Sequence, residues 1–494
     1  MRVFFIFLFG IVISTLLWVA SYTFEAAQKN QITYRYIADA LVAQPFVAAG
    51  VVWRSNDTEL VRPFTSIDAE VIGKVLSESW QILTIAQSTG EASILTHSFT
   101  GVALERAKVS VNDAKDFGGR MVVLRQQATP VFYHLDGSLF QAEIETLTAR
   151  FITDGTGLSS YELTTDINIV TLMNESSGWR VYSLERTRTE PNQFYLSPWI
   201  GSARGVNYYP SATPWRDFFP KFDEDTIDED FKRIRNIGAD SVRIFLTRSD
   251  FLGETAPASL QKLERLLDIA AENNLSVVPT LFDLKQDFRL GTWHDDTQYL
   301  EQVLPVLAAS KSVDFVDLKN EPDLDFDSYG AGTITAWLRS MMGITRTLAP
   351  SLSLTVGWSN SEDAYRLKED LDVITYHDYT PSAESSSRLN SVIRLAQGKP
   401  VLITEIGVSS YELALGFPSS EARQAHEIER RLKALDTSNG IFLWSLYDFA
   451  NVDASVVGRS PWVRRLQGSF GMFRNDGSAK PLAGSIRSQW AASE

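Results

Sequence analysis

The sequence contains no cysteine, and it has few histidines. Without cysteine there can be no disulfide bond, no thiolate nucleophile, no cysteine-based zinc site and no lipid attached to a cysteine. The five histidines are scattered along the chain. Neither a His-Glu-x-x-His zinc helix nor a phosphate-binding Gly-Lys-Ser/Thr loop is present. The acidic stretch 323–330 lacks the glycine and the terminal glutamate of a calcium loop. We therefore predict no metal site and no cofactor.

Positive charge is in deficit, because 46 lysines and arginines stand against 61 aspartates and glutamates, for a net charge of −15. This balance argues against nucleic acid or an anionic membrane surface as a partner. The hydrophobic fraction of 44% and the charged fraction of 22% are those of a globular protein. A chain of 494 residues is long enough for two or three domains. The composition does not indicate an oligomeric state.

Charge is also missing near the start of the chain, where no charged residue occurs from Val3 to Phe24. This run matches the ~20 residues of a membrane-spanning helix and exceeds the roughly 7–15 residues of a secretion-signal core. We predict that residues 1–28 form an uncleaved signal anchor; a cleaved signal is the alternative. Because Arg2 holds the start in the cytoplasm, the body of the protein is expected on the periplasmic or extracellular side.

Residues 31–190 are predicted to form a smaller α+β domain. Apolar residues recur at helical spacing over 68–86 and 98–114, and four strand-like segments separated by turn signals follow. Two helices followed by a curved antiparallel sheet resemble the NTF2-like fold. Such a domain could bind a ligand, or it could act as a spacer that packs on its neighbour, which is the simpler interpretation.

After a linker at 189–199 the pattern changes, and residues 196–494 alternate short apolar runs with helical stretches. Several of these runs are almost entirely apolar, as expected for strands buried on both faces. Eight strand–helix units in this length predict a (β/α)₈ barrel, the TIM-barrel architecture of the α/β class. The predicted strands are 203–209, 239–246, 275–284, 313–320, 352–358, 371–379, 400–407 and 440–449.

Chemically useful side chains stand where these strands end, which is where barrel enzymes place their functional groups. Glu321 closes the fourth predicted strand and Glu405 the seventh, so the two carboxylates would share one rim. Glycoside hydrolysis needs such a pair, with one carboxyl protonated and the other ionised. Five further residues stand on predicted strands or strand ends: Arg243 in the second strand, Asn320 at the end of the fourth, His377 and Tyr379 at the end of the sixth, and Trp444 in the eighth.

The segments "LKNEP" (318–322) and "LITEIG" (402–407) resemble the clan-A retaining glycoside hydrolases, the cellulase-like and mannanase-like barrel enzymes. The resemblance covers roughly residues 200–490. It implies that Glu321 is the acid/base and Glu405 the nucleophile. It also implies substrate-binding or positioning roles for Asn320, Arg243, His377, Tyr379 and Trp444. One position departs from the pattern, because Asp283 ends the third strand where many cellulase-like members carry histidine.

Together these features predict a membrane-anchored, exported retaining glycoside hydrolase, or a transglycosylase that uses the same site. The family resemblance implies a β-linked carbohydrate substrate, which would be an envelope or extracellular poly- or oligosaccharide cleaved by double displacement. The alternative is a non-catalytic glycan-binding scaffold subunit of an exopolysaccharide assembly. The sugar, its linkage and the choice between internal and terminal cleavage are not specified by the sequence.

Overall fold

The computed structural model describes residues 50–55, 60–154, 157–176, 178–192, 194–414 and 416–491. The predicted signal anchor at 1–28 lies outside these residues. Within the described part of the chain, no helix combines the length and the apolar character that crossing a membrane requires.

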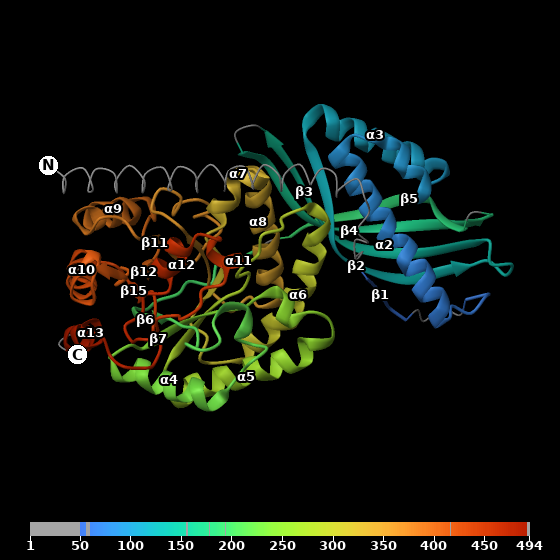
Figure 1. The fold of residues 1–494 in the computed structure, drawn as a ribbon. Helices are drawn as coiled ribbons and strands as arrows, with labels where there is room; N and C mark the ends of the chain where they lie inside the picture. The colour runs from blue at the N-terminus through green and yellow to red at the C-terminus, as the bar shows by residue number, and fades with distance from the viewer. Residues whose placement is uncertain are drawn as a thin grey trace, which may run out of the picture.

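The first described domain is a curved five-stranded sheet with two helices against one face (Figure 1). The strands follow the order β1-β2-β3-β4-β5; β2 to β5 are antiparallel, whereas β1 pairs with β2 in parallel. The elements are β1 (Val51–Trp53), α2 (Ser66–Thr89), a short 3-10 helix (Ala92–His97), α3 (Gly101–Phe117), β2 (Gly119–Tyr133), β3 (Leu139–Asp154), β4 (Gly157–Glu175) and β5 (Gly178–Pro191). The order of helices and strands agrees with the sequence prediction, except that β1 was not predicted. The likeness to the NTF2-like fold stays a prediction.

Local signals set the bounds of the two helices. Thr65 and Asp68 form a capping box at the start of α2, so the first free N–H groups of the helix are satisfied. Gly90 and Gly118 end α2 and α3 in the left-handed conformation, which glycine adopts without steric cost. The inner faces of both helices and of the sheet then form an apolar core around residues such as Phe140.

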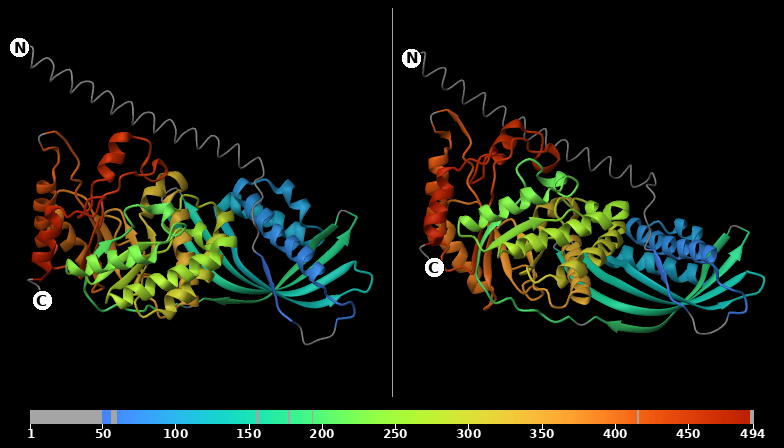
Figure 2. Two further views of the ribbon diagram at one scale, coloured as in Figure 1. Left: turned by 60° about the horizontal axis from the view of Figure 1, so that its bottom comes forward. Right: turned by 90° about the horizontal axis from the view of Figure 1, so that it is seen from below.

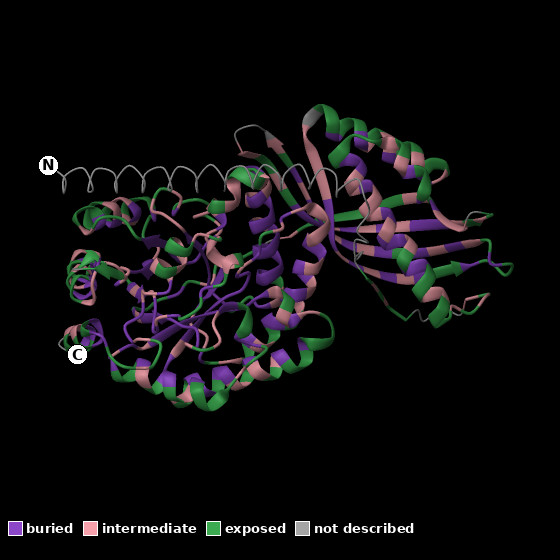
Figure 3. Ribbon diagram, viewed as in Figure 1, coloured by how far each residue is buried: buried purple, intermediate pink, exposed green. Residues whose placement is uncertain are grey.

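The second domain is a closed barrel of eight parallel strands. All eight strands predicted from the sequence are present, with bounds that differ by a few residues. They are β6 (Ala203–Asn207), β7 (Ser241–Phe245), β8 (Ser276–Thr280), β9 (Val316–Asn320), β10 (Leu354–Trp358), β11 (Ile374–Asp378), β12 (Val401–Ile406) and β15 (Gly440–Leu443). Most of their residues are buried, as Figure 3 shows, because the strands are covered on both faces.

Helices surround the barrel, and shorter elements build its mouth. The outer helices are α4 (Glu224–Asn236), α5 (Ala256–Glu272), α6 (Trp293–Ala309), α8 (Ala331–Leu348), α9 (Ser382–Leu395), α10 (Glu421–Ala434) and α13 (Pro481–Ala491). The shorter elements are α7 (Phe326–Tyr329), the hairpin of β13 (Glu412–Ala414) and β14 (Phe417–Pro418), α11 (Ala454–Val457) and α12 (Pro461–Gln467). These shorter elements follow the carboxyl ends of β9, β12 and β15 and were not predicted.

The two domains share one hydrophobic core, because α6 and α8 of the barrel pack against the sheet (Figures 1 and 2). Phe151 of β3 stacks on Trp293 at the start of α6, with ring centroids 5.4 Å apart and planes inclined by 13°. Nδ1 of the buried His294 lies 2.9 Å from the backbone oxygen of Leu124 in β2. The sheet domain is therefore built onto the barrel as a packed unit.

Candidate active site

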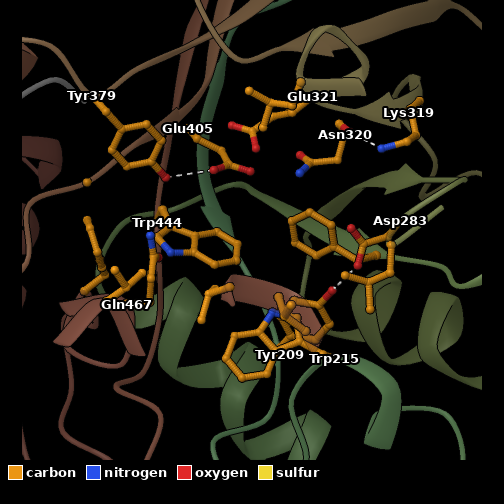
Figure 4. A pocket seen from close by; sticks show the side chains of 18 of the residues that line it. Tyr209, Trp215, Asp283, Lys319, Asn320, Glu321, Tyr379, Glu405, Trp444 and Gln467 are labelled. Carbon is orange, nitrogen blue, oxygen red and sulfur yellow. Dashed lines mark hydrogen bonds between the residues drawn. The ribbon is translucent and has the colours of Figure 1, made fainter. Parts of the chain in front are cut away.

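The two glutamates face one another at the carboxyl end of the barrel. Glu405 projects from β12, and Glu321 directly follows β9. Three atoms lie within 4.8 Å of one another: a carboxylate oxygen of Glu321, a carboxylate oxygen of Glu405 and a ring nitrogen of His377. Figure 4 shows the two carboxyl groups directed toward each other at the top of the cavity. Two residues that are far apart in the sequence therefore meet within the span of a single sugar ring.

The backbone at Glu321 aims its side chain into the mouth of the barrel. Glu321 adopts φ 49° and ψ 53°, a left-handed conformation that side chains other than glycine rarely take. Pro322 follows it, and a proline disfavours the right-handed helical conformation in the residue before it. The Glu321 N–H donates a 2.7 Å hydrogen bond to the backbone oxygen of Gly357 in the neighbouring strand β10, which holds the turn in place.

A fully buried arginine holds Glu405. Arg243 of β7 donates from Nη1 to Oε1 of Glu405 at 2.6 Å, and from Nη2 to Asp317 at 2.6 Å. Nη1 also donates to Asn207, and Nη2 to Oδ1 of Asn320 at 2.7 Å. Burial alone would lower the pKa of Arg243, but the charges of Asp317 and Glu405 raise it above its ordinary value. The guanidinium is thus a permanent positive charge behind Glu405.

Tyr379 holds the second oxygen of Glu405. Its hydroxyl donates to Oε2 at 2.8 Å, so both oxygens of Glu405 accept a hydrogen bond from a fixed donor (Figure 4). Burial of the hydroxyl, together with the charges of Glu405 and Glu321, raises the pKa of Tyr379 well above its ordinary value. The tyrosine therefore stays protonated and, together with Arg243, fixes the orientation of the Glu405 carboxyl group.

His377 connects the two glutamates from behind. Its Nδ1 lies 2.9 Å from Oε1 of Glu321 and 3.7 Å from Oε2 of Glu405, and its side chain is buried. Burial alone would lower the pKa of His377, but Glu405 and Glu321 raise it above its ordinary value. Burial would likewise raise the pKa of Glu321, but the hydrogen bond and charge of His377 lower it. The two shifts favour a protonated His377 beside an ionised Glu321, with the proton in the hydrogen bond between Nδ1 and Oε1.

The glutamates open onto a cavity of about 810 Å³, large enough for a small-molecule ligand. Trp444, which directly follows β15, presents its ring beside Glu405 in this cavity (Figure 4). Phe245 supports it edge to face at 5.8 Å and 87°. Tyr209 and Trp215 line the lower part of the cavity. An aromatic floor of this kind offers a flat apolar surface for the face of a sugar ring.

All seven residues singled out in the sequence meet at this site. Asn320, Glu321, Tyr379, Glu405 and Trp444 line the cavity, whereas Arg243 and His377 lie buried behind the two glutamates. Because Oδ1 of Asn320 accepts from Arg243, its amide nitrogen is oriented to donate toward a ligand. The catalytic and binding roles of these residues remain predictions.

Sequence reasoning missed several residues that complete the site. Asp317 in β9 and Asn207 at the end of β6 both accept hydrogen bonds from Arg243 and are fully buried, and a polar residue on a predicted buried strand was a visible signal. Tyr209 and Lys319 also line the cavity; Lys319 belongs to the LKNEP segment, but no role was predicted for it. Asp283, noted only as a departure from the family pattern, also lines the cavity and accepts a 2.6 Å hydrogen bond from Tyr209.

No family model matches the sequence, and no curated protein matches it. Similar solved structures include the exo-beta-1,4-mannosidase Op5Man5 from Opitutaceae bacterium strain TAV5, with a TM-score of 0.49 and 19% identity over 60% of this chain and 61% of that chain. A GH2 beta-galacturonidase from Eisenbergiella tayi bound to galacturonate has a TM-score of 0.48 and 13% identity over 75% and 72% of the two chains. GH5_18 from Streptomyces cattleya in complex with GlcNAc has a TM-score of 0.47 and 18% identity over 60% and 82%. The chain thus spans about three fifths of the mannosidase. Likenesses this distant carry no argument about its chemistry, which has to be judged from its own residues.

Proposed function

We propose that this protein is a retaining glycoside hydrolase, or a transglycosylase, that acts on β-glycosidic bonds of an envelope or extracellular poly- or oligosaccharide. One observation carries the proposal. Glu321 and Glu405 face each other with carboxylate oxygens within 4.8 Å, and only Glu405 is held by an arginine and a tyrosine. Retaining glycosidases keep their two carboxyl groups about 5–5.5 Å apart, whereas inverting enzymes need about 6.5–9.5 Å.

In the first step Glu405 attacks the anomeric carbon of a sugar that lies over Trp444. The glycosidic C–O bond breaks as the ester bond to Glu405 forms, and the leaving oxygen takes a proton from Glu321. Arg243 and Tyr379 each donate a hydrogen bond to one oxygen of Glu405 and fix its orientation before the attack. The amide nitrogen of Asn320 donates to the sugar hydroxyl beside the reacting carbon, a contact that strengthens as the oxocarbenium ion forms.

In the second step Glu321 acts as the base. It removes a proton from a water molecule, the water oxygen attacks the anomeric carbon, and the ester bond to Glu405 breaks to restore the carboxylate. Two inversions at one carbon give net retention. A sugar hydroxyl in place of the water turns the same step into transglycosylation.

His377 supplies the proton balance of this cycle. The pair of Glu321 and His377 holds one proton up to the raised pKa of His377. Formation of the ester removes the negative charge of Glu405, which lies 3.7 Å from the imidazole. Loss of that charge lowers the proton affinity of the pair, which helps Glu321 to give up its proton in the first step and to act as a base in the second.

Membrane anchoring and export belong to this proposal through the uncharged run from Val3 to Phe24. A tether of this kind would keep the cavity close to carbohydrate that is made or trimmed at the cell envelope. Protease protection of the body in intact cells, compared with lysed cells, tests the expected side of the membrane.

The catalytic proposal is tested by trapping the glycosyl-enzyme. A panel of 2-deoxy-2-fluoro β-glycosides with an activated leaving group should inactivate the wild type, and peptide mass analysis should locate the label on Glu405. Glu405→Gln should lower turnover of dinitrophenyl β-glycosides at least about 1,000-fold, because the nucleophile is lost. Glu321→Ala should leave a slow second step that azide accelerates, with a β-glycosyl azide as the product.

Glu362→Gln is the matched control, because Glu362 is an exposed glutamate that does not line the cavity. This variant should keep wild-type rates. Binding of β-glycans without turnover or labelling, by wild type and by Glu405→Gln alike, would contradict the enzyme and favour a non-catalytic scaffold.

A further inference from the structure

A buried lysine in the cavity is not used by the proposed mechanism. Lys319 is the residue before Asn320 in β9, is 5% exposed and lines the cavity. Its Nζ donates to the backbone oxygen of Asn320, and among the described residues no carboxylate lies within ion-pair distance of it. Because an ammonium carries three N–H donors, Lys319 keeps donor capacity for a molecule in the cavity.

A second lysine that lines the cavity, Lys285, differs from Lys319 because a carboxylate pairs with it. Lys285 is buried to a similar degree, but its Nζ lies 2.9 Å from Asp296 and also donates to the backbone oxygen of Asp287. Its charge is therefore neutralised inside the protein. Lys319 has no such partner, and a buried ammonium without one is unfavourable unless a ligand supplies acceptors.

A buried acceptor stands on the same side of the cavity. Asp283 follows β8, the strand that pairs with β9, and it is 6% exposed. Figure 4 shows Asp283 and Lys319 on the side of the cavity away from Tyr379. One oxygen of Asp283 accepts from the Tyr209 hydroxyl, which leaves acceptor capacity on a group with about four lone-pair sites. Burial raises the pKa of Asp283, whereas the Tyr209 hydrogen bond and the charge of Lys319 oppose this rise.

Lys319 and Asp283 line the same side of the cavity and do not pair directly with each other, so they offer a donor and an acceptor to one ligand. Two neighbouring sugar hydroxyls need this combination, because each hydroxyl both donates and accepts. We propose that Asp283 and Lys319 together bind two adjacent hydroxyl groups of one sugar ring, and that the cavity selects a neutral sugar over a uronic acid. The inference rests on the proposed function and specifies its substrate class.

The charges around the cavity favour the neutral sugar. Four carboxylates line it: Asp283, Glu321, Asp325 and Glu405. Two further cations, Lys285 and Arg431, also line it, but Lys285 pairs with Asp296 and Arg431 donates to backbone oxygens. A uronic acid would add a further carboxylate to this group, and the repulsion between like charges would oppose its binding. Lys319 offsets part of this repulsion, which is why the comparison between neutral and acidic substrates is informative.

The test uses dinitrophenyl β-glycosides of neutral hexoses, the monodeoxy analogues of the best one, and the corresponding β-glucuronide. Lys319→Met removes the ammonium and keeps a long side chain. It should lower kcat/KM for the parent hexoside about 10- to 100-fold, the effect of one charge-assisted hydrogen bond. The wild type should already have a low kcat/KM for the deoxy analogue that lacks the contacted hydroxyl. Lys319→Met should change this kcat/KM less than threefold, because neither enzyme can form the hydrogen bond with that analogue.

Asp283→Asn should likewise lower kcat/KM for the parent hexoside, and it should change kcat/KM little for the deoxy analogue that lacks the adjacent hydroxyl. Lys285→Met is the comparison variant, and its ratio of parent to deoxy substrate should equal that of the wild type, because its ammonium is bound to Asp296. Equal losses by Lys319→Met on the parent and on every deoxy analogue would overturn the inference in favour of a structural lysine. A higher kcat/KM for the glucuronide than for the hexosides would overturn it in favour of an acidic sugar. Wild-type labelling of Glu405 by the fluoro-sugar is scored separately, and its absence would refute the proposed function itself.

Discussion

Replacement of Arg243 by lysine would separate the charge behind Glu405 from the geometry that holds it. The guanidinium donates five hydrogen bonds to four groups: Asp317, Asn207, Glu405 and Asn320. A lysine ammonium has only three donors, so at least two of these bonds are lost. At about 1.5–3 kcal/mol for each hydrogen bond to a charged group, the loss is about 3–6 kcal/mol, divided between folding and transition-state stabilisation.

Arg243→Lys should therefore fold, melt several degrees below the wild type, and react with the fluoro-sugar at least about 100-fold more slowly, which corresponds to roughly 2.7 kcal/mol. The first-order inactivation rate at saturating fluoro-sugar and the thermal unfolding curve measure the two parts. Arg346→Lys is the matched control, because Arg346 is a buried arginine outside the cavity that pairs with Asp372 at 2.7 Å. It should lose stability and keep the wild-type inactivation rate. Inactivation of Arg243→Lys within threefold of wild type would refute the reasoning, as would equal slowing by Arg346→Lys.

Two further predictions concern the proton of the site and the contact between the domains. His377→Gln should move the alkaline limb of kcat/KM to lower pH, since the pair with Glu321 no longer holds its proton at a raised pKa; an unmoved limb would contradict the pair. The pKa of His377 is raised on folding, so the stability that this shift contributes is present below pH 6.5 and is lost as the pH rises through the raised pKa. The difference in melting temperature between the wild type and His377→Gln should therefore shrink at alkaline pH. Phe151→Ala should destabilise the protein by about 3–5 kcal/mol in calorimetry and lower one shared transition, because Phe151 packs on Trp293 across the domain contact. Phe140→Ala is the comparison variant, because Phe140 lies in the core of the sheet domain alone. Two separate unfolding transitions, only one of which is lowered by Phe151→Ala, would show that the domains unfold independently.

The barrel could be predicted from the sequence because each strand is buried on both faces and therefore reads as a short apolar run. The ends of the strands were less accurate. Trp444 was placed inside the eighth strand, whereas β15 ends at Leu443 and Trp444 follows it. Strand β1 was missed because its three residues carry too weak a pattern, and they are fixed only by pairing with β2, far along the chain.

The candidate site was predicted as a set of residues, but its geometry was not. The sequence placed Glu321 and Glu405 on one rim, yet the distance between them depends on the curvature of the barrel and on the turn at Glu321. Asp317 was visible as a charged residue in a buried strand, but its partner Arg243 lies two strands away and is identified only in three dimensions. No role was predicted for Lys319, although it lies within the LKNEP segment, because a lysine is ordinarily assumed to face solvent.

The left-handed backbone at Glu321 has a consequence for how this position could change over evolutionary time. A residue with a Cβ in this conformation costs about 1–2 kcal/mol, which glycine would not incur, so the barrel would be more stable without a glutamate here. Selection for stability alone would remove it. A glutamate at a turn that disfavours any side chain therefore sets the direction of its carboxylate at the expense of fold stability.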